Sequence, residues 1–350
     1  MMEALVKTAN RIYENIEDEL SRRVFLDRLA YSVSGERKHI EKLLDDTVRA
    51  DKEWRRFIDT VNNICMDEIV LFGNGIWGKT IRSEIKQIKC IIDNSSSASD
   101  KSGITVIDAS GFFDSYSGEK IIISSYKNRE SMLEQCRNEG VPDANILDAA
   151  SVIYGLTEGK IYFDEDIPVK IKNGVFIDGG SFDGCDSKRF IDKYHGKTIC
   201  FEPDKSNIRR IDEKLESYEG AYRIIPKALW CGQEELSFLS EGDCGSKIEV
   251  ETSGNDWVLA SSIDIEAEKE NICMIKMDIE GAEMEALRGA ENTIKREHPI
   301  LAISIYHKPE DILSIPEYIM STYDGYRFYL RHYSFSWYDT VLYAVPKEMI

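Results

Sequence analysis

The stretch that decides the fold reads Val-Phe-Ile-Asp-Gly-Gly-Ser-Phe-Asp-Gly at residues 175–184. Three apolar residues lead to Asp178, glycines follow, and a helix is expected to begin near Asp186 or Ser187, both of which are good N-cap residues. Glycine reaches positive φ values and lets a ligand approach the backbone, because it has no Cβ. The pattern predicts a buried strand, a ligand-binding turn and a helix.

The spacing of this turn indicates the kind of ligand. It reads Asp-Gly-Gly-x-x-x-Gly rather than Gly-x-Gly-x-x-Gly, so the pyrophosphate cradle of a dinucleotide site is not spelled out. Glu202 ends the next predicted strand, 24 residues after Asp178, where a carboxylate can accept hydrogen bonds from both hydroxyls of a ribose. The turn is therefore expected to bind a nucleoside that has no diphosphate.

Seven predicted strands run through the C-terminal half, with helices between the first five. This alternation indicates a mostly parallel, doubly wound α/β sheet. The strands are expected at residues 174–178, 198–202, 222–225, 272–278, 300–306, 326–331 and 341–345.

A second strand, glycine turn and helix lie earlier in the chain. After the apolar residues 69–72, Gly73, Gly75 and Gly78 have the Gly-x-Gly-x-x-Gly spacing, and Asp93 closes the next strand. This context matches a dinucleotide-binding fingerprint and predicts a nucleotide site. The unit is shorter than a complete six-strand dinucleotide domain, so a ligand-free scaffold is an equal alternative.

Three blocks of the sequence resemble the FkbM-type methyltransferases. They are Phe-Ile-Asp-Gly-Gly-Ser-Phe-Asp-Gly at 176–184, Phe-Glu-Pro-Asp at 201–204, and Ile-Lys-Met-Asp-Ile-Glu-Gly-Ala-Glu at 275–283, the last continued by Ala-Leu-Arg-Gly-Ala at 286–290. The resemblance covers roughly residues 160–350. It implies the class I methyltransferase sheet, whose last strand is antiparallel, and residues 341–345 would form that strand.

The resemblance also implies S-adenosylmethionine as the cofactor and a hydroxyl oxygen as the methyl acceptor, often on a sugar or natural product. Gly180 and Gly184 would line the cofactor, Glu202 would hold its ribose, and Asp178 would face its methionyl ammonium. Adenine would pack near Ala228 and Leu229. The full set of expected cofactor-binding residues is Asp178, Gly179, Gly180, Ser181, Phe182, Gly184, Glu202, Pro203, Ala228, Leu229 and Asp278.

Four side chains at the ends of the fourth and fifth strands are candidates for moving the acceptor's proton. Methyl transfer from a sulfonium is an in-line displacement, which depends on alignment and on a general base for a weak alcohol nucleophile. His307 is the best base on intrinsic grounds, because an imidazole titrates near neutral pH, and Asp278 and Glu280 complete the predicted catalytic set. With Glu283, these two acids also offer oxygen ligands, so Mg²⁺ is an alternative, while no Cys or His spacing supports zinc.

These patterns predict an α/β protein of four parts. Residues 1–64 are a helical region with a packing or dimerisation role, 65–150 a small Rossmann-like nucleotide-binding-type domain, 151–173 a connector, and 174–350 the class I methyltransferase domain. Residues 330–338, which include Arg331, His332 and four aromatic residues, are either a stacking surface for a sugar acceptor or part of the core.

Charge and cysteine usage restrict the partners and the compartment. Forty-four Lys and Arg against 63 Asp and Glu give a net charge of −19, which repels nucleic acid and anionic lipid. The eight cysteines form no Cys-x-x-Cys pair, the N-terminus has no signal-like apolar segment, and no apolar run is long enough to span a membrane. We expect a cytoplasmic enzyme with a small-molecule or glycan acceptor, in an oligomeric state that the sequence leaves open.

Two other functions would depend on a nucleotide bound at the turn of residues 73–78. One is an NAD-dependent oxidoreductase whose C-terminal half is the substrate domain, although no Tyr-x-x-x-Lys dyad lies near a fitting strand. The other is a binding protein that senses a nucleotide without catalysis.

Overall fold

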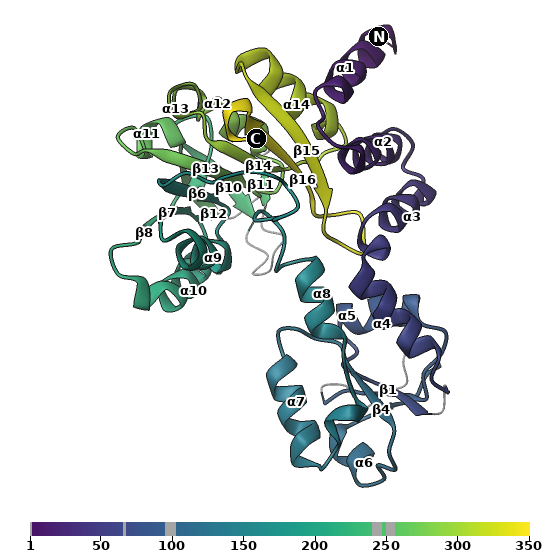
Figure 1. Cartoon of the computed structure of the whole chain (residues 1–350). Coiled ribbons are helices and arrows are strands. Elements are labelled where there is room, and N and C mark those ends of the chain that lie inside the picture. The colour runs from purple at the N-terminus through teal and green to yellow at the C-terminus, as the bar shows by residue number, and fades with distance from the viewer. Residues whose placement is uncertain (1, 66–67, 95–102, 240–246, 250–255) are drawn as a thin grey trace. The chain divides into compact units, whose positions relative to one another are not determined.

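The computed structural model describes residues 2–65, 68–94, 103–239, 247–249 and 256–350 (Figure 1). The chain forms two compact units. The smaller consists of residues 47–161 with 333–335, and the larger of residues 1–46, 162–332 and 336–350.

The smaller unit is a Rossmann-like parallel sheet of five strands in the order β3-β2-β1-β4-β5. Its strands are β1 (Ile69–Phe72), β2 (Cys90–Ile92), β3 (Val106–Ile107), β4 (Lys120–Ile123) and β5 (Ile146–Asp148). Its helices are α4 (Lys52–Asn62), α5 (Ile76–Glu84), α6 (Ala109–Phe113), α7 (Arg129–Asn138) and α8 (Ala149–Leu156), with 3-10 turns at Val48–Ala50 and Asp143–Asn145.

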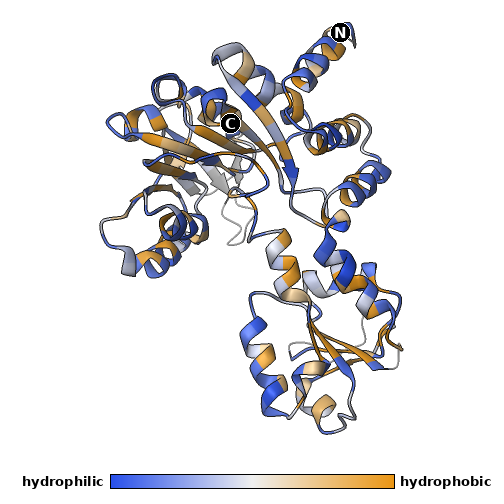
Figure 2. Cartoon of the chain, in the orientation of Figure 1, coloured by the Kyte–Doolittle hydropathy of each residue, from blue (hydrophilic) through white to orange (hydrophobic). Residues whose placement is uncertain are grey.

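The strands of this sheet are continuous apolar runs, as expected for a parallel sheet that is buried on both faces. Along β1, Ile69 and Leu71 join one buried cluster, while Val70 and Phe72 join the other. Alternate residues of a strand point to opposite faces, so the two clusters lie on the two sides of the sheet. Figure 2 shows the apolar colour of β1 and β4 accordingly.

The larger unit is built on a seven-stranded sheet in the order β15-β16-β14-β13-β6-β7-β8. Its strands are β6 (Val175–Gly179), β7 (Lys197–Phe201), β8 (Tyr222–Ile225), β13 (Ile272–Met277), β14 (Ile300–Ser304), β15 (Tyr326–His332) and β16 (Thr340–Pro346). Only β16 runs against its neighbours in this sheet. All seven predicted strands are confirmed to within two residues, and so is the antiparallel last strand.

Helices connect most of these strands, as expected. They are α9 (Cys185–Tyr194), α10 (Lys205–Leu215), α11 (Ile263–Glu266), α12 (Glu283–Arg288), α13 (Glu291–Glu297) and α14 (Asp311–Thr322), with 3-10 turns at Glu216–Tyr218 and Lys347–Met349.

The connection from β8 to β13 differs from the prediction. A helix alone was expected there, but the connection contains a separate four-stranded sheet in the order β11-β10-β12-β9, followed by the short α11. Its strands are β9 (Ala228–Leu229), β10 (Glu234–Leu239), β11 (Lys247–Glu249) and β12 (Asp256–Ser261). The β10 strand pairs antiparallel with both β11 and β12, so these inserted strands satisfy backbone hydrogen bonds within their own sheet.

The sequence predicted residues 1–64 as a separate helical region, but the structure divides them between the two units. Helices α1 (Met2–Glu14), α2 (Glu19–Ser34) and α3 (Arg37–Asp46) belong to the larger unit, while α4 belongs to the smaller. The reason is that β15 is an edge strand: the Phe328 amide donates to the Asn15 carbonyl at 3.1 Å, and the Glu17 amide donates to the Phe328 carbonyl at 3.0 Å. The N-terminal segment thereby covers backbone groups that an edge strand leaves unpaired.

The expected connector at 151–173 is also divided differently. Residues 151–156 lie within α8 of the smaller unit, and the larger unit resumes at Tyr162. Among the described residues, no helix combines the length and the apolar character that crossing a membrane requires.

Candidate functional site

The glycine turn after β6 packs directly on the end of β13. Gly180 has a φ of 74°, and a Cβ placed on it would lie 2.0 Å from the carbonyl oxygen of Asp278. The amides of Gly180 and Ser181 both donate to the Phe201 carbonyl, at 3.1 and 3.2 Å. Only glycine fits at position 180, so the turn is fixed against the two strands that flank β6.

The helix after this turn begins one residue earlier than expected. Gly184, with a φ of 76°, is the N-cap of α9, and the Asp183 carboxylate accepts a hydrogen bond from the Cys185 amide at 3.0 Å. Ser187, expected as a cap, instead donates its hydroxyl to Asp178 at 2.8 Å. The expectation that Asp186 or Ser187 caps this helix was therefore wrong.

Glu202 lies beside the turn, at the end of β7. Its carboxylate accepts hydrogen bonds from the Phe182 amide at 3.0 Å and from the Asp204 amide at 2.9 Å. Burial raises the pKa of Glu202, and these amides oppose the shift. Pro203 follows it, half-buried, and the predicted cofactor residues of β6 and β7 are thus neighbours in space.

Asp178 is fully buried beneath the turn and has partners of its own. The Lys276 ammonium lies 3.0 Å from one carboxylate oxygen, and it also donates to the Gly180 carbonyl at 2.8 Å. Burial disfavours the charge of Lys276, but the surrounding carboxylates, Asp178 first, raise its pKa above the usual value. The sequence had assigned Asp178 to a ligand ammonium, whereas the structure gives it the ammonium of Lys276.

Lys276 is a residue that the sequence interpretation missed. A signal was present, because it is the one charged residue in the run Ile-Cys-Met-Ile-Lys-Met of β13. A buried lysine in a central strand requires a buried acid nearby.

The inserted sheet also reaches the turn. A Cβ on Gly179 would lie 2.9 Å from a methyl carbon of Leu229, and both Ala228 and Leu229 are buried. The β9 strand is held there by pairing with β12. The residues expected beside adenine therefore border the glycine turn.

Asp278, at the end of β13, accepts two phenolic hydrogen bonds. Tyr162 donates to one oxygen at 2.8 Å and Tyr306 to the other at 3.1 Å. Burial opposes ionisation of Asp278, but His307, Lys276 and the Tyr162 hydroxyl keep its pKa below the usual value. The carboxylate is charged at neutral pH.

Tyr162 is a second residue that the sequence did not indicate. It has a φ of 66°, which is unusual for a residue with a side chain, and its amide donates to the Tyr343 hydroxyl at 2.9 Å. Such backbone conformations are often found at functional sites. Tyr162 lies in the stretch read as a connector, with no local motif to mark it.

His307 lies among three carboxylates. Its Nδ1 is 2.9 Å from Glu283, and its Nε2 is 3.5 Å from both Asp278 and Glu280. Burial lowers the pKa of the imidazole, but these carboxylates, Glu283 first, raise it to about 9. His307 is therefore a cation at neutral pH, which corrects the expectation that it titrates near pH 7.

One trio in this cluster has the spacing of metal ligands. Asp278, Glu283 and His307 each offer a ligand atom within 4.8 Å of the others, whereas the sequence had suggested Asp278, Glu280 and Glu283. A metal would have to displace the proton that the imidazole holds. Glu280 has a φ of 56°, a positive value that it shares with two other non-glycine residues of the site, Tyr162 and Phe182.

The aromatic stretch 330–338 is mostly core. Arg331 and His332 are buried in β15, and Phe335 packs in the core of the smaller unit. The exception is Trp337, which is 46% exposed and lies edge-on to Tyr306, with ring centroids 6.3 Å apart.

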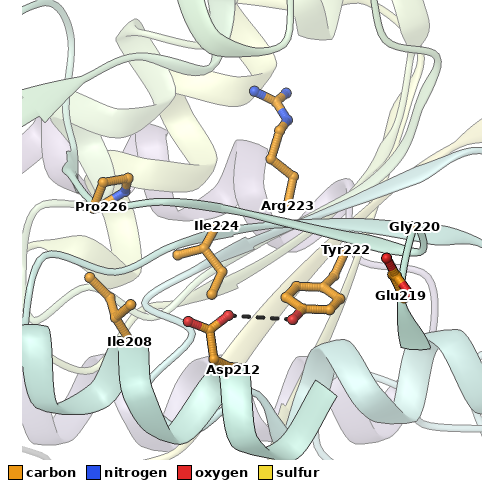
Figure 3. Close-up of a pocket in the computed structure, with 8 residues that line it drawn as sticks. All are labelled: Ile208, Asp212, Glu219, Gly220, Tyr222, Arg223, Ile224 and Pro226. Carbon is orange, nitrogen blue, oxygen red and sulfur yellow. Dashed lines mark hydrogen bonds between the residues drawn. The ribbon is translucent and has the colours of Figure 1, made fainter. Parts of the chain in front are cut away.

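A surface cavity of about 470 Å³ lies along the edge strand β8, between it and α10 (Figure 3). The Tyr222 hydroxyl donates to Asp212 there, at 3.3 Å. None of the predicted site residues lines this cavity. Its lining residues are Ile208, Asp212, Glu219, Gly220, Tyr222, Arg223, Ile224 and Pro226.

The glycine turn of the smaller unit lies between β1 and α5, where helix and strand approach closely. Gly73 has a φ of 105°, and a Cβ on Gly78 would lie 2.0 Å from the Gly73 carbonyl oxygen, while a Cβ on Gly75 would meet nothing within 4 Å. The Asp93 carboxylate accepts a hydrogen bond from the Asn74 amide at 2.7 Å. The four predicted residues are therefore brought together at the end of β1.

Sheet order, the antiparallel β16 and the glycine turn define the larger unit as a Rossmann-like domain of the class I methyltransferase type. Residues 178–335 match the family model described as the methyltransferase FkbM domain. This part of the chain is a methyltransferase domain of the FkbM family.

Solved structures of methyltransferases are similar to the chain at low sequence identity. An FkbM methyltransferase from Methylobacillus flagellatus is 18% identical, with 84% of this chain and 93% of that chain covered and a TM-score of 0.46. Fibrillarin from Aeropyrum pernix, with bound S-adenosylmethionine, is 12% identical over 55% and 73%, and an rRNA methylase from Streptococcus thermophilus is 12% identical over 51% and 89%, each with a TM-score of 0.34. No curated protein matches the chain.

Proposed function

We propose that the protein transfers the methyl group of S-adenosylmethionine to a hydroxyl oxygen of a small polar acceptor such as a sugar. The observation that carries this proposal is the glycine turn wedged between β7 and β13, with the Glu202 carboxylate at its side. The FkbM domain at residues 178–335 supports methyl transfer as the reaction. The net charge of −19 favours a small acceptor over nucleic acid.

The chain's own residues suit a nucleoside at this turn. Gly180 and Gly184 have no side chains, so a ligand can approach the backbone there. The Leu229 side chain lies next to Gly179 and offers an apolar surface. A carboxylate can accept about four hydrogen bonds, so Glu202 can accept them from a ribose while it holds the amides of Phe182 and Asp204. The bound cofactor supplies an electrophilic methyl group on a sulfonium.

We assign proton transfer to the carboxylates rather than to the imidazole. Asp278 is ionised and is oriented by two tyrosine hydroxyls, and Glu280 lies 3.5 Å from the His307 Nε2 atom. These two carboxylates orient the acceptor hydroxyl and accept its proton as the oxygen attacks. The protonated His307 stabilises the negative charge that gathers there.

Calorimetry with S-adenosylhomocysteine tests the cofactor site, and a tritiated methyl donor with a panel of sugars tests the reaction. Glu202→Ala should weaken binding at least tenfold, because it removes the ribose partner. The matched control is Glu213→Ala, a change to an exposed acid of α10. Equal affinity in both variants would contradict the role of Glu202, and no binding to the wild-type protein would contradict the proposal itself.

A second candidate function concerns the smaller unit, which we propose binds a nucleotide that carries a diphosphate. Its support is that Gly73, Gly75 and Gly78 have the three separate properties that such a turn requires: positive φ, open space for the ligand, and close approach of helix to strand. If the ligand is a nucleotide sugar, the smaller unit would supply an acceptor for methyl transfer. If the ligand is NAD, the function would instead be that of an oxidoreductase.

Titration with NAD and with UDP-sugars tests this second site. Gly75→Val should abolish binding without unfolding the unit, because its side chain would fill the open space. Gly155→Ala, in the same unit and also in open space, is the control. Absence of binding to the wild-type protein would leave the unit as a scaffold.

A further inference from the structure

Helix α2 brings a buried arginine to the methyltransferase site. Arg28 is 2% exposed. One end of its guanidinium donates to the main-chain carbonyl of Tyr306 at 3.1 Å, and the other end donates to the main-chain carbonyl of Trp337. These residues all belong to the larger unit, so the contact is internal to it.

The two carbonyls belong to segments that border the reacting groups. Tyr306 donates to Asp278, and its ring lies 4.1 Å from the ring of His307. The Tyr306 ring also lies edge-on to the exposed ring of Trp337, with ring centroids 6.3 Å apart. The Ile305 amide donates to the Thr340 carbonyl at 3.0 Å, so a backbone hydrogen bond also joins the two segments.

Arginine suits this place for a geometric reason. Its planar guanidinium presents donors in a fixed fork, so a single side chain can hold two carbonyls at a set separation. A lysine ammonium is a compact point charge on a flexible stem, and it does not impose that separation. Burial lowers the pKa of Arg28 to about 10, so the group still carries its charge at neutral pH.

We propose that Arg28 is a positioning residue that holds Trp337 as one wall of the acceptor site, next to Tyr306 and His307. This role rests on the methyl-transfer function proposed above. The acceptor would be a ring with one apolar face and several hydroxyl groups. The apolar face would stack on Trp337, while hydroxyls reach Asp278 and Glu280. Helix α2 lies in a region for which the sequence predicted only a packing or dimerisation role, and it thereby builds part of the site.

The test compares Arg28→Lys with Arg22→Ala in the full chain. Arg22 lies on the same helix and donates to the Ile16 carbonyl at 2.8 Å, away from these two segments. With the sugar that the wild-type protein methylates best, R28K should raise KM about tenfold, change kcat less, and leave the affinity for S-adenosylhomocysteine within twofold. Trp337→Ala should raise KM in the same way. An unchanged KM in R28K, or an equal change in R22A, would overturn the proposal.

Hydrogen exchange provides a readout that does not depend on activity. R28K should speed amide exchange in residues 304–308 and 336–340 several-fold, and R22A should not. If the wild-type protein methylates no sugar, the proposed function fails, and the exchange result alone decides whether Arg28 positions these segments. Unchanged exchange in R28K would then overturn the inference.

Discussion

The Nδ1 atom of His307 lies 2.9 Å from the Glu283 carboxylate, and both side chains are buried. This pair determines the charge of the site. Burial lowers the pKa of the imidazole, but Glu283, with Asp278 and Glu280 behind it, raises the pKa to about 9. The site therefore contains a cation surrounded by acids, and not a neutral base.

Glu283→Gln should lower the pKa of His307 by at least one unit, because it removes the nearest carboxylate. A histidine whose folded pKa is raised stabilises the fold below its unfolded pKa near 6.5, and this contribution is lost as pH rises through about 9. We therefore expect wild-type stability to fall by on the order of 2–3 kcal/mol between pH 6 and 10 through this group, and E283Q to lose much of that dependence.

Imidazole NMR titration, with His307→Asn to assign the signal, measures this pKa directly. Glu285→Gln on the same helix is the control, because Glu285 pairs with Arg288 instead. A His307 pKa near 6.5 in the wild-type protein would show that the acids do not act as described.

Gly180→Ala tests the wedge between the turn and β13. The new methyl group would meet the Asp278 carbonyl oxygen at 2.0 Å in a backbone conformation with φ of 74°, so it should destabilise the larger unit by several kcal/mol and abolish cofactor binding. Gly220→Ala is matched to it: φ is 78°, and nothing lies within 4 Å. Its cost should be only about 1 kcal/mol. Equal thermal shifts in the two variants would mean that the close approach at Gly180 does not matter.

Lys276→Met should destabilise the larger unit by about 3–5 kcal/mol, because it leaves the Asp178 carboxylate buried without its cation. Asp178→Asn added to K276M should recover much of that loss, since no charge is then stranded. Urea unfolding of both single variants and the double variant measures the coupling between the two residues. The exposed pair of Lys188 and Asp192 is the reference, and K188M should cost less than about 1 kcal/mol. Additive effects of K276M and D178N would contradict the pairing.

The sequence predicted the main sheet well because each of its strands is an apolar run bounded by turn residues. The sheet between β8 and β13 was not predicted, since its strands form by pairing with one another and not with the main sheet. Asn15 and Glu17 likewise carry no sign that they will pair with Phe328, which lies more than 300 residues away.

The sequence predicted which residues form the site but not the charge of His307. Motifs placed Asp278, Glu280 and His307 together, because the carboxyl ends of neighbouring parallel strands share one edge of the sheet. The pKa of His307 depends on how many carboxylates face it after folding, which no motif states. Tyr162 approaches Asp278 from a segment 116 residues away, so only the tertiary structure reveals its contribution.

The buried carboxyl of Asp311 makes the stability of the fold depend on pH. Asp311 is the first residue of α14 and is 4% exposed. Burial raises the pKa of its carboxyl to about 7, Glu283 adds to the shift, and the Lys308 amide, which donates at 3.2 Å, opposes it. A carboxyl whose folded pKa lies above its unfolded value destabilises the fold increasingly as pH rises from about 4 to 7.

Asp311→Asn removes this ionisation while its amide oxygen can still accept from Lys308. The variant should melt at the wild-type temperature near pH 4.5 and several degrees higher at pH 8, where the wild-type carboxylate is charged and buried. Asp324→Asn, at an exposed position of the same unit, should shift the melting temperature little at either pH. A D311N shift of equal size at pH 4.5 and pH 8 would mean that packing, and not the charge of Asp311, sets the difference.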